Sequence, residues 1–279
     1  MKRTKIIANI FLFIGILLCL YPIISRIITQ MTQGTVISTY ESTVTKDTQV
    51  LEQTLNEAKK YNELLNTAKN TINGNSQEEM TILNEYDKQL NITGDGIMGT
   101  IEIPKIDVNL PIYHGTSDSV LSKGVGHWEE SNLPVGQKNT RSILTGHRGL
   151  PNAKLFTRLD EIEKDDYFFI RVCNQTFAYQ VKQIEVIKPE EVEKLSVVLD
   201  KDLVSLITCT PYAVNTHRLV VTGERVPYKE KMEETVKENP VSRKIRYFSL
   251  PLFLIVTGIV LKKYKERKNR KHEKKQKKN

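Results

Sequence analysis

A cysteine at the end of a strongly apolar stretch is the residue of this sequence best suited to covalent chemistry. Cys209 closes the run Leu203-Val-Ser-Leu-Ile-Thr-Cys209 and is followed at once by Thr210-Pro211-Tyr212. A strand that stops at a proline turn presents its last side chain at the rim of a sheet, where a substrate can reach it. Acyl transfer by cysteine needs a thiolate, a nearby base or imidazolium, and a donor to the developing oxyanion. Cys209 is therefore a candidate nucleophile.

Two other roles remain open for Cys209. A free cysteine is commonly a small buried hydrophobe. An exported pair of cysteines can also form a disulfide, and the partner would be Cys173, which lies near a turn in Arg171-Val-Cys-Asn174. Cys173 itself fits the description of a buried filler better than Cys209 does. The third cysteine, Cys19, lies within an apolar run near the start of the chain.

A base for the thiol has to come from one of five histidines. His147 lies in Leu144-Thr-Gly-His-Arg-Gly149, a strand end that enters a glycine-bounded loop. Flanking glycines let backbone and substrate approach an imidazole closely. His127, in the loop-like stretch Gly-Val-Gly-His-Trp, is the alternative, and spacing alone favours His147 only weakly. His114 is expected in a turn, and His272 lies in the basic tail.

An arginine is expected close to Cys209. Arg218 opens a second apolar run after the short loop Thr210–His217, and two strands joined by so short a loop are expected to be neighbours. A guanidinium there would favour the thiolate and donate to an oxyanion. The alternative is a surface salt bridge. His217 directly precedes Arg218, so in a strand the two side chains point to opposite faces.

The elements that must position these residues are short and rich in β-branched residues. They occur at Met98–Ile103, Val108–Ile112, Arg141–Thr145, Tyr167–Val172, Thr176–Ile187, Leu203–Cys209 and Arg218–Val226. Glycine, proline, asparagine and aspartate separate them. About eight strands with few long helices predict a mainly β fold with accessory helices (α+β), built on a closed or nearly closed barrel. A short helix is expected near Leu155–Leu159, on the outside of the barrel.

The part of the chain before Gly96 is expected to be helical. From Thr35 to about Ile72, apolar residues recur at three- and four-residue steps or their sums, and they form one stripe: Leu51, Leu55, Ala58, Leu65 and Ala68. Gly74-Asn75-Ser76 interrupts the pattern. This stripe is expected to pack on the barrel.

Two apolar runs predict flanking transmembrane helices. Ile6–Ser25 has the roughly 20 residues needed to cross a bilayer, and Tyr247–Leu261 is a shorter second span. Eleven Lys/Arg against two Glu follow from residue 262 onward, a net of +9, as expected of cytoplasmic flanks that meet lipid headgroups. Both ends are then cytoplasmic and the catalytic part is extracellular. The high isoelectric point therefore indicates membrane topology, and no nucleic-acid partner is expected.

The motifs resemble those of the sortases, cysteine transpeptidases of Gram-positive cell surfaces. Ser205-Leu-Ile-Thr-Cys209 is similar to their Thr-Leu-X-Thr-Cys signature, with serine in place of the first threonine. Thr-Gly-His147 resembles their catalytic-histidine segment, and Asn215-Thr-His-Arg218 the segment with the catalytic arginine. The strand Ile101-Glu-Ile-Pro-Lys-Ile-Asp107 and the second apolar run resemble the class C, pilus-assembling branch.

This resemblance implies an eight-stranded sortase-type barrel and a mechanism. Cys209 would attack the Thr–Gly bond of a Leu-Pro-X-Thr-Gly-like sorting signal, His147 would move protons, and Arg218 would stabilise the oxyanion. A lysine of another pilin subunit would then resolve the thioester. Thr208 would lie beside the site as a hydrogen-bonding partner, and His127 and His217 would be structural. The chemistry needs no cofactor and no metal.

The expected organisation along the chain follows from these segments. It comprises residues 1–30 as cytoplasmic start and anchor, 31–95 as helical segment and lid region, 96–230 as catalytic barrel, 231–246 as linker, 247–261 as second transmembrane segment and 262–279 as basic cytoplasmic tail. Many class C sortases carry a lid pinned by an Asp-Pro-aromatic motif. Residues 73–95 contain no proline, and Asp87 is followed by Lys88, so no lid anchor carries over.

Three alternative functions remain at this point. A sortase that attaches surface proteins to cell-wall peptide would share the first half-reaction. A cysteine protease would release the thioester to water. An inactive membrane-tethered scaffold would not need Cys209, His147 and Arg218 together.

Overall fold

A computed structural model describes residues 2–44, 48–70, 84–150 and 153–229, together with Gln77, Thr81 and Met232. The chain divides into two units, residues 1–236 and 237–279. The expected second span, Tyr247–Leu261, and the basic tail lie outside the described residues, as does part of the expected lid region. In the described part, no helix is both long and apolar enough for a membrane crossing, so the flanking transmembrane helices are not shown.

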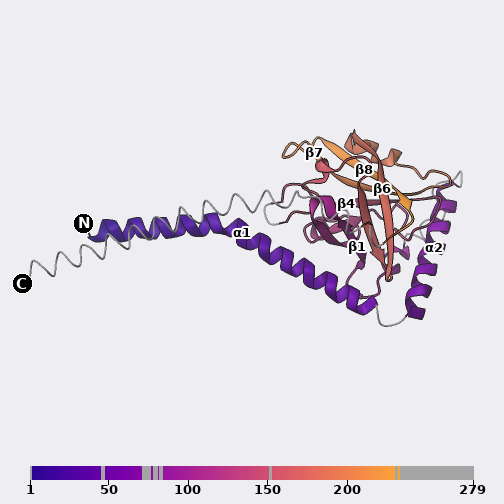
Figure 1. Ribbon diagram of the computed structural model, residues 1–279, viewed down its shortest axis with the longest axis horizontal. Coiled ribbons are helices and arrows are strands. Elements are labelled where there is room, and N and C mark those ends of the chain that lie inside the picture. Colours follow the sequence, from indigo (N-terminus) through magenta and orange to yellow (C-terminus); the bar gives the residue numbers. More distant parts are fainter. Residues whose placement is uncertain are drawn as a thin grey trace, which may run out of the picture. The chain divides into compact units, whose positions relative to one another are not determined.

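Eight strands close into a barrel, as the sequence predicts (Figure 1). They are β1 (Ile97–Ile103), β2 (Val108–His114), β3 (Val125–His127), β4 (Thr140–Thr145), β5 (Tyr167–Val172), β6 (Gln175–Ile187), β7 (Asp202–Thr210) and β8 (His217–Val226). Their order around the barrel is β1-β2-β3-β4-β7-β8-β6-β5. The β2–β3 and β4–β7 pairs are parallel and the other pairs antiparallel.

The strand β7 carries the longest unbroken run of buried residues among the strands of the barrel. It pairs with β4 on one side and β8 on the other. Residues 202–208 are all buried, because the inner face fills the barrel and an overlying loop covers the outer face. Leu206 pairs with Val221, and neither side chain is exposed. A strand buried on both faces reads as a near-continuous apolar run, which is why the sequence indicated it clearly.

The strand β3 was not predicted from the sequence. It has only three residues, Val125–His127, and the run contains Gly126. A Cβ on Gly126 would lie 2.4 Å from the carbonyl oxygen of Gly115, so only glycine lets the two segments come this close. His127 therefore ends a strand, whereas the sequence placed it in a loop. Three residues with glycine in the middle are too few to show a period of two.

Two helices precede the barrel in place of the single helix expected from Thr35 to Ile72. The first, α1, spans Lys2–Val44, and the second, α2, spans Thr48–Asn70. The predicted stripe on α2 is confirmed: Leu51, Leu55, Ala58, Leu65 and Ala68 are all buried.

Side-chain hydrogen bonds join both helices to the barrel. Tyr40 of α1 donates its hydroxyl to the carbonyl oxygen of Met98 at 3.2 Å. The amide of Asn62 on α2 donates to the carbonyl oxygen of Leu133 and accepts from its N–H, at 3.0 and 2.7 Å. Asn62 is fully buried, so these two bonds satisfy polar groups that water cannot reach.

The remaining helices of the described part are short; η1 precedes β1, and the others lie between strands. They are η1 (Tyr86–Lys88), η2 (Pro104–Ile106), α4 (Asp118–Leu121), η3 (Leu159–Glu161) and η4 (Pro189–Lys194). The helix expected near Leu155–Leu159 is wrong in position, because residues 155–158 form turns and η3 begins only at Leu159. Leu155 has φ of 36°, a conformation that an α-helix does not contain.

A buried polar cluster fixes η1 against β3. The hydroxyl of Tyr86 lies 2.9 Å from Nδ1 of His127, and Nε2 of His127 lies 2.9 Å from the carbonyl oxygen of Asn132. A carbonyl only accepts, so Nε2 carries the proton and Nδ1 accepts from Tyr86. Burial lowers the pKa of His127 to about 4. The imidazole is therefore neutral and structural in the folded protein.

This cluster predicts a specific loss of stability in acid. The folded-state pKa of His127, about 4, lies below its usual 6.5, so the unfolded chain binds the proton more readily. The contribution of His127 to the free energy of unfolding is fully present above about pH 6.5 and is lost as the pH falls toward 4. The loss between pH 7 and 5 is about 2 kcal/mol. Urea unfolding at several pH values measures it. The variant His127→Gln keeps a donor and an acceptor, and its free energy of unfolding should fall less over this range. Parallel curves for the two proteins would contradict the assignment.

Candidate active site

The strand register places Cys209 and Arg218 directly opposite each other. They are cross-strand partners on β7 and β8, and both residues are half-buried. The connecting loop is shorter than expected, because Thr210 and His217 are themselves paired and only residues 211–216 lie between the strands. Side chains of directly opposed residues lie on the same face of a sheet. The thiol and the guanidinium therefore share the rim of the barrel.

His147 follows β4, the other neighbour of β7. The parallel register pairs Thr145 with Ile207, and the N–H of Gly146 donates to the carbonyl oxygen of Ile207 at 3.0 Å. His147 lies two residues after Thr145, and Cys209 lies two residues after Ile207. The register thus brings the loop of His147 level with the end of β7. No hydrogen bond to its imidazole is present among the described residues.

Thr208 holds the histidine loop in place. Its hydroxyl donates to the carbonyl oxygen of Gly146 at 2.7 Å, and its side chain is buried. Successive side chains on a strand point to opposite faces, so Thr208 does not share the face of Cys209. Thr208 thus makes its hydrogen bond to the loop that carries His147, while its role in the reaction stays a prediction. Gly146 is required here, because a Cβ would lie 2.7 Å from the ring of Phe156.

Arg218 makes no ion pair with any described carboxylate. Its Nη1 donates to the carbonyl oxygens of Asn215 and His217, at 3.3 and 3.1 Å. The alternative of a surface salt bridge is therefore wrong for the part of the chain that the structure describes. A guanidinium held only by neutral carbonyls keeps its positive charge available for a thiolate or an oxyanion nearby.

A second arginine beside the site was not anticipated from the sequence. Arg148 follows His147, and its Nη1 donates to the hydroxyl of Thr210 at 3.1 Å while Nη2 pairs with Asp160 at 2.6 Å. Its guanidinium lies 5.8 Å from the ring centre of Tyr212. Arg148 thus connects the histidine loop to the residue after Cys209. The signal in the sequence is only its adjacency to His147, because Asp160 and Tyr212 are distant along the chain.

Cys173 and Cys209 differ in their surroundings, and both are free. The disulfide alternative is therefore wrong. Cys173 is 4% exposed, and burial raises its pKa to about 12. A thiol of that kind does not ionise near neutral pH and is a poor nucleophile. Cys209 is the cysteine whose side chain lies at the rim.

The other described histidines have backbone or hydroxyl partners away from the thiol. His114 ends β2, not a turn, and its ring nitrogens lie 2.9 and 2.7 Å from the carbonyl oxygens of Gly96 and Gln89. Nδ1 of His217 lies 2.9 Å from the hydroxyl of Thr216. Together with buried His127, these contacts leave His147 as the histidine beside the end of β7.

An apolar strip continues from Cys209 along the outer face of the sheet. Ile143, Ile207 and Val220 form a small buried cluster, and the partly buried side chains of Trp128, Ile187, Val192 and Leu195 pack on it. Ile207 is two residues from Cys209, and Val220 two from Arg218. A thiol, an imidazole loop and a guanidinium without a carboxylate partner among the described residues thus lie at the end of an apolar strip, on a closed barrel. These are the groups that a cysteine acyl-transfer enzyme requires.

Comparison with known proteins identifies the family. The sortase domain matches residues 101–226. Sortase D of Bacillus subtilis (strain 168) is 30% identical over 197 residues, which are 69% of this chain and 93% of the relative. The crystal structure of sortase C1 from Streptococcus agalactiae superposes with a TM-score of 0.64 at 43% identity, covering 70% of this chain and 100% of that one. Sortase C of Streptococcus pneumoniae gives 0.58 at 37% identity, with coverage of 70% and 97%.

The chain therefore belongs to the sortases, a family of cysteine transpeptidases. Its solved structural neighbours include class C sortases, as the motifs predicted.

The contacts of Arg148 predict a role in positioning the histidine loop. Replacing it by methionine removes the bonds to Thr210 and Asp160 while keeping much of the aliphatic stem. Because small displacements of reacting groups cost much of the rate, we expect the Arg148→Met variant to form the thioester roughly 10- to 100-fold more slowly.

Single-turnover kinetics with a sorting-signal peptide measures this rate. Arg158→Met is the matched control, since Arg158 also pairs with a carboxylate, that of Glu161 at 2.6 Å, but lies in another turn. Equal rates for the two variants would contradict the positioning role of Arg148.

Proposed function

We propose that this chain cleaves a Leu-Pro-X-Thr-Gly-like sorting signal between Thr and Gly, through a thioester on Cys209, and transfers the acyl group to a lysine of a pilin subunit. The observation that carries the proposal is the pairing of Cys209 with Arg218, whose guanidinium has no described carboxylate partner. The similarity to sortase C of Streptococcus pneumoniae, whose structure is reported to bear on pilin substrate specificity, supports the choice of substrate.

In the first half-reaction the thiolate of Cys209 attacks the carbonyl carbon of Thr in the signal. The carbonyl oxygen becomes an oxyanion, to which Arg218 donates hydrogen bonds. His147, protonated at this stage, gives its proton to the leaving nitrogen of Gly as the C–N bond breaks. The products are a thioester on Cys209 and the free amine of the cleaved segment.

In the second half-reaction the amine of a pilin lysine attacks the thioester. His147, now neutral, accepts a proton from that amine, and the C–S bond breaks to release the thiolate of Cys209. The new bond is an isopeptide bond between two subunits. The buried cluster of Ile143, Ile207 and Val220 supports the face of the sheet beside the thiol during this step.

We also infer that the chain is anchored in the cell membrane with the barrel outside the cytoplasm. The support is the sequence pattern, namely the apolar runs Ile6–Ser25 and Tyr247–Leu261 with basic residues beside them. The full chain, expressed in a Gram-positive host, should stay in the membrane pellet after alkaline carbonate extraction. A protease added outside intact protoplasts should degrade the barrel. Release of the protein by carbonate would refute the anchor.

The transpeptidase proposal is tested by product analysis. The purified protein is incubated with a Leu-Pro-X-Thr-Gly peptide and a pilin-derived peptide that carries a lysine, and the products are identified by mass spectrometry. We expect an isopeptide-linked product. Product formed only with a cell-wall peptide amine would instead support attachment of surface proteins, and hydrolysis alone would support a protease.

Two cysteine variants provide the matched comparison. Cys209→Ala should abolish both thioester and product, because the nucleophile is lost. Cys173→Ala should keep the activity, because that buried thiol does not ionise and takes no part. A Cys209→Ala protein that still forms product would overturn the proposed nucleophile.

A further inference from the structure

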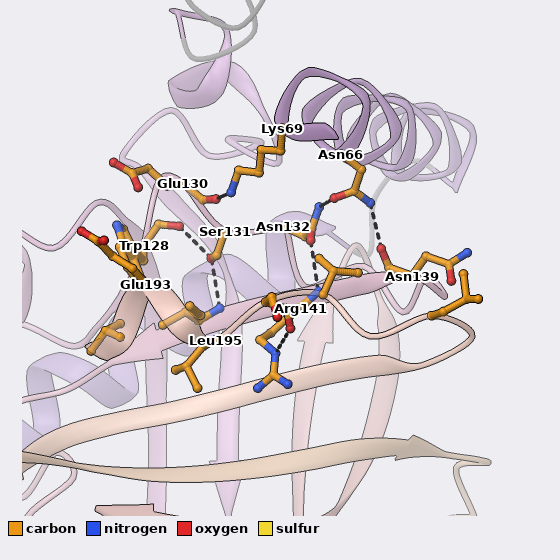
Figure 2. A pocket seen from close by; sticks show the side chains of 15 residues that line it. Asn66, Lys69, Trp128, Glu130, Ser131, Asn132, Asn139, Arg141, Glu193 and Leu195 are labelled. Carbon is orange, nitrogen blue, oxygen red and sulfur yellow. Dashed lines mark hydrogen bonds between the residues drawn. The ribbon is translucent and has the colours of Figure 1, made fainter. Parts of the chain in front are cut away.

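A groove runs along the outer face of β4, beyond the apolar strip. Its volume is about 660 Å³. One wall comes from α2 and the loop between β3 and β4, with Asn66 and Asn132, and the other from the segment between η4 and β7, with Leu195 and Val197. Figure 2 shows Arg141 of β4 midway along it, with Trp128 toward one end and Asn139 toward the other. The proposed mechanism does not use this groove.

The groove is continuous with the strip that leads to the nucleophile. Ile143 and Trp128 line the groove and also belong to the cluster around Ile207, two residues before Cys209. Further along the same face, Nη1 of Arg141 donates to the hydroxyl of Ser205 at 2.9 Å. Since alternate residues of a strand share a face, Ser205, Ile207 and Cys209 form one row.

Ser205 and Ile207 are buried, so a substrate would lie over the residues that cover this row, and the length of the row gives the distance from the thiol to the level of Arg141. Ser205 is four residues from Cys209, which is about 13 Å along a strand. An extended acyl segment attached to Cys209 covers the same distance in about four residues, the Leu-Pro-X-Thr of the sorting signal. The residues just before that leucine then enter the groove at the level of the guanidinium.

The charge of Arg141 is poorly compensated at this place. Its side chain is buried, and its hydrogen-bond partners among the described residues are neutral: the carbonyl oxygen of Ser196 at 2.7 Å and the hydroxyl of Ser205. Among the described residues no carboxylate forms an ion pair with it. Burial lowers the pKa of Arg141, while the more distant charge of Glu185 raises it. A buried guanidinium with neutral partners is stabilised by an incoming carboxylate.

The other charges of the groove lie apart from Arg141. Figure 2 shows Glu130 and Glu193 at the end near Trp128, which is the end closer to the apolar strip. Lys69 donates to the backbone carbonyl oxygen of Glu130 on that side. The middle and far parts are lined by the uncharged amides of Asn66, Asn132 and Asn139. Asn66 and Asn132 bond each other and the backbone of Asn139 and Arg141.

We propose that this groove binds the donor polypeptide immediately before its sorting signal, in extended form, and that Arg141 selects an acidic side chain one or two residues before the leucine. The inference rests on the proposed function, because it assumes a thioester at Cys209. It makes Arg141 a specificity-determining residue and defines the donor by chemistry: an acidic residue upstream of the Leu-Pro-X-Thr-Gly signal.

Donor peptides that differ in charge before the leucine test this proposal with the unaltered protein. Four donors are compared with the full chain: the bare Leu-Pro-X-Thr-Gly signal, and the same signal extended by three residues with Asp, Asn or Lys at the two positions before the leucine. We expect kcat/KM for cleavage to be about tenfold higher with Asp than with Lys. The difference should shrink as salt is raised, because screening weakens such pairs.

A pair of surface variants checks the location. Val197 lines the groove and is 39% exposed, whereas Val186 of β6 is 59% exposed and does not line it. Val197→Glu places a negative charge on the groove wall and should reduce the preference for Asp over Lys at least threefold. Val186→Glu adds the same charge elsewhere and should leave the preference unchanged. Arg141→Lys keeps the charge and should keep the sign of the preference.

The outcomes separate the two proposals. Failure to cleave even the bare signal would refute the proposed function. Cleavage of the bare signal with equal rates for the Asp, Asn and Lys donors would refute the groove and leave the function standing. Equal effects of Val197→Glu and Val186→Glu on the preference for Asp over Lys would also refute the groove as the site that selects the charge of the donor.

Discussion

The register of β7 between β4 and β8 is the constraint on which the rest of the site depends. Side chains alternate along a strand, so Ser205, Ile207 and Cys209 point to the outer face while Val204, Leu206 and Thr208 do not. A slip of one residue would exchange the two sets. The thiol would then point into the barrel and a hydroxyl to the rim. Hydrogen bonds to β4 on one side and β8 on the other make such a slip costly.

For three arginines of the site and the groove, the groups around the guanidinium, and not the residue type, determine what the side chain is suited to do. Arg148 is neutralised by Asp160 and serves to connect loops. Arg218 is held by carbonyl oxygens at the rim and is the cross-strand partner of Cys209. Arg141 is buried on the floor of a groove with neutral partners. The same chemical group is thus suited to positioning, to oxyanion stabilisation and to recognition of a carboxylate.

Burial likewise separates structural groups from candidate reactive groups among the cysteines and histidines. Cys173 and His127 lie away from water, which raises the pKa of the thiol and lowers that of the imidazole. Both are therefore neutral at physiological pH and suit a packed core. Cys209 and His147 lie half-buried at the end of neighbouring strands. Exposure at a strand end, together with a cation in the next strand, separates a candidate reactive group from a structural one.

The sequence by itself determined the strands that are long and apolar, the helical stripe on α2, and the residues proposed for catalysis. These features follow from local patterns: alternation, a step of three or four residues, and short motifs around Cys209, His147 and Arg218. It missed β3, because three residues with a central glycine have no readable period. It also merged α1 with α2 and placed a helix too early near Leu155.

Only the tertiary structure decided what distant segments do together. The pairing of Arg148 with Asp160 and Tyr212, the absence of a Cys173–Cys209 disulfide, and the inward place of Thr208 all depend on contacts between separate elements. The groove is the clearest case, since its walls come from α2, the β3–β4 loop and the segment after η4. No local pattern reports such a surface, because it exists only once the barrel has closed and brought these three segments around β4.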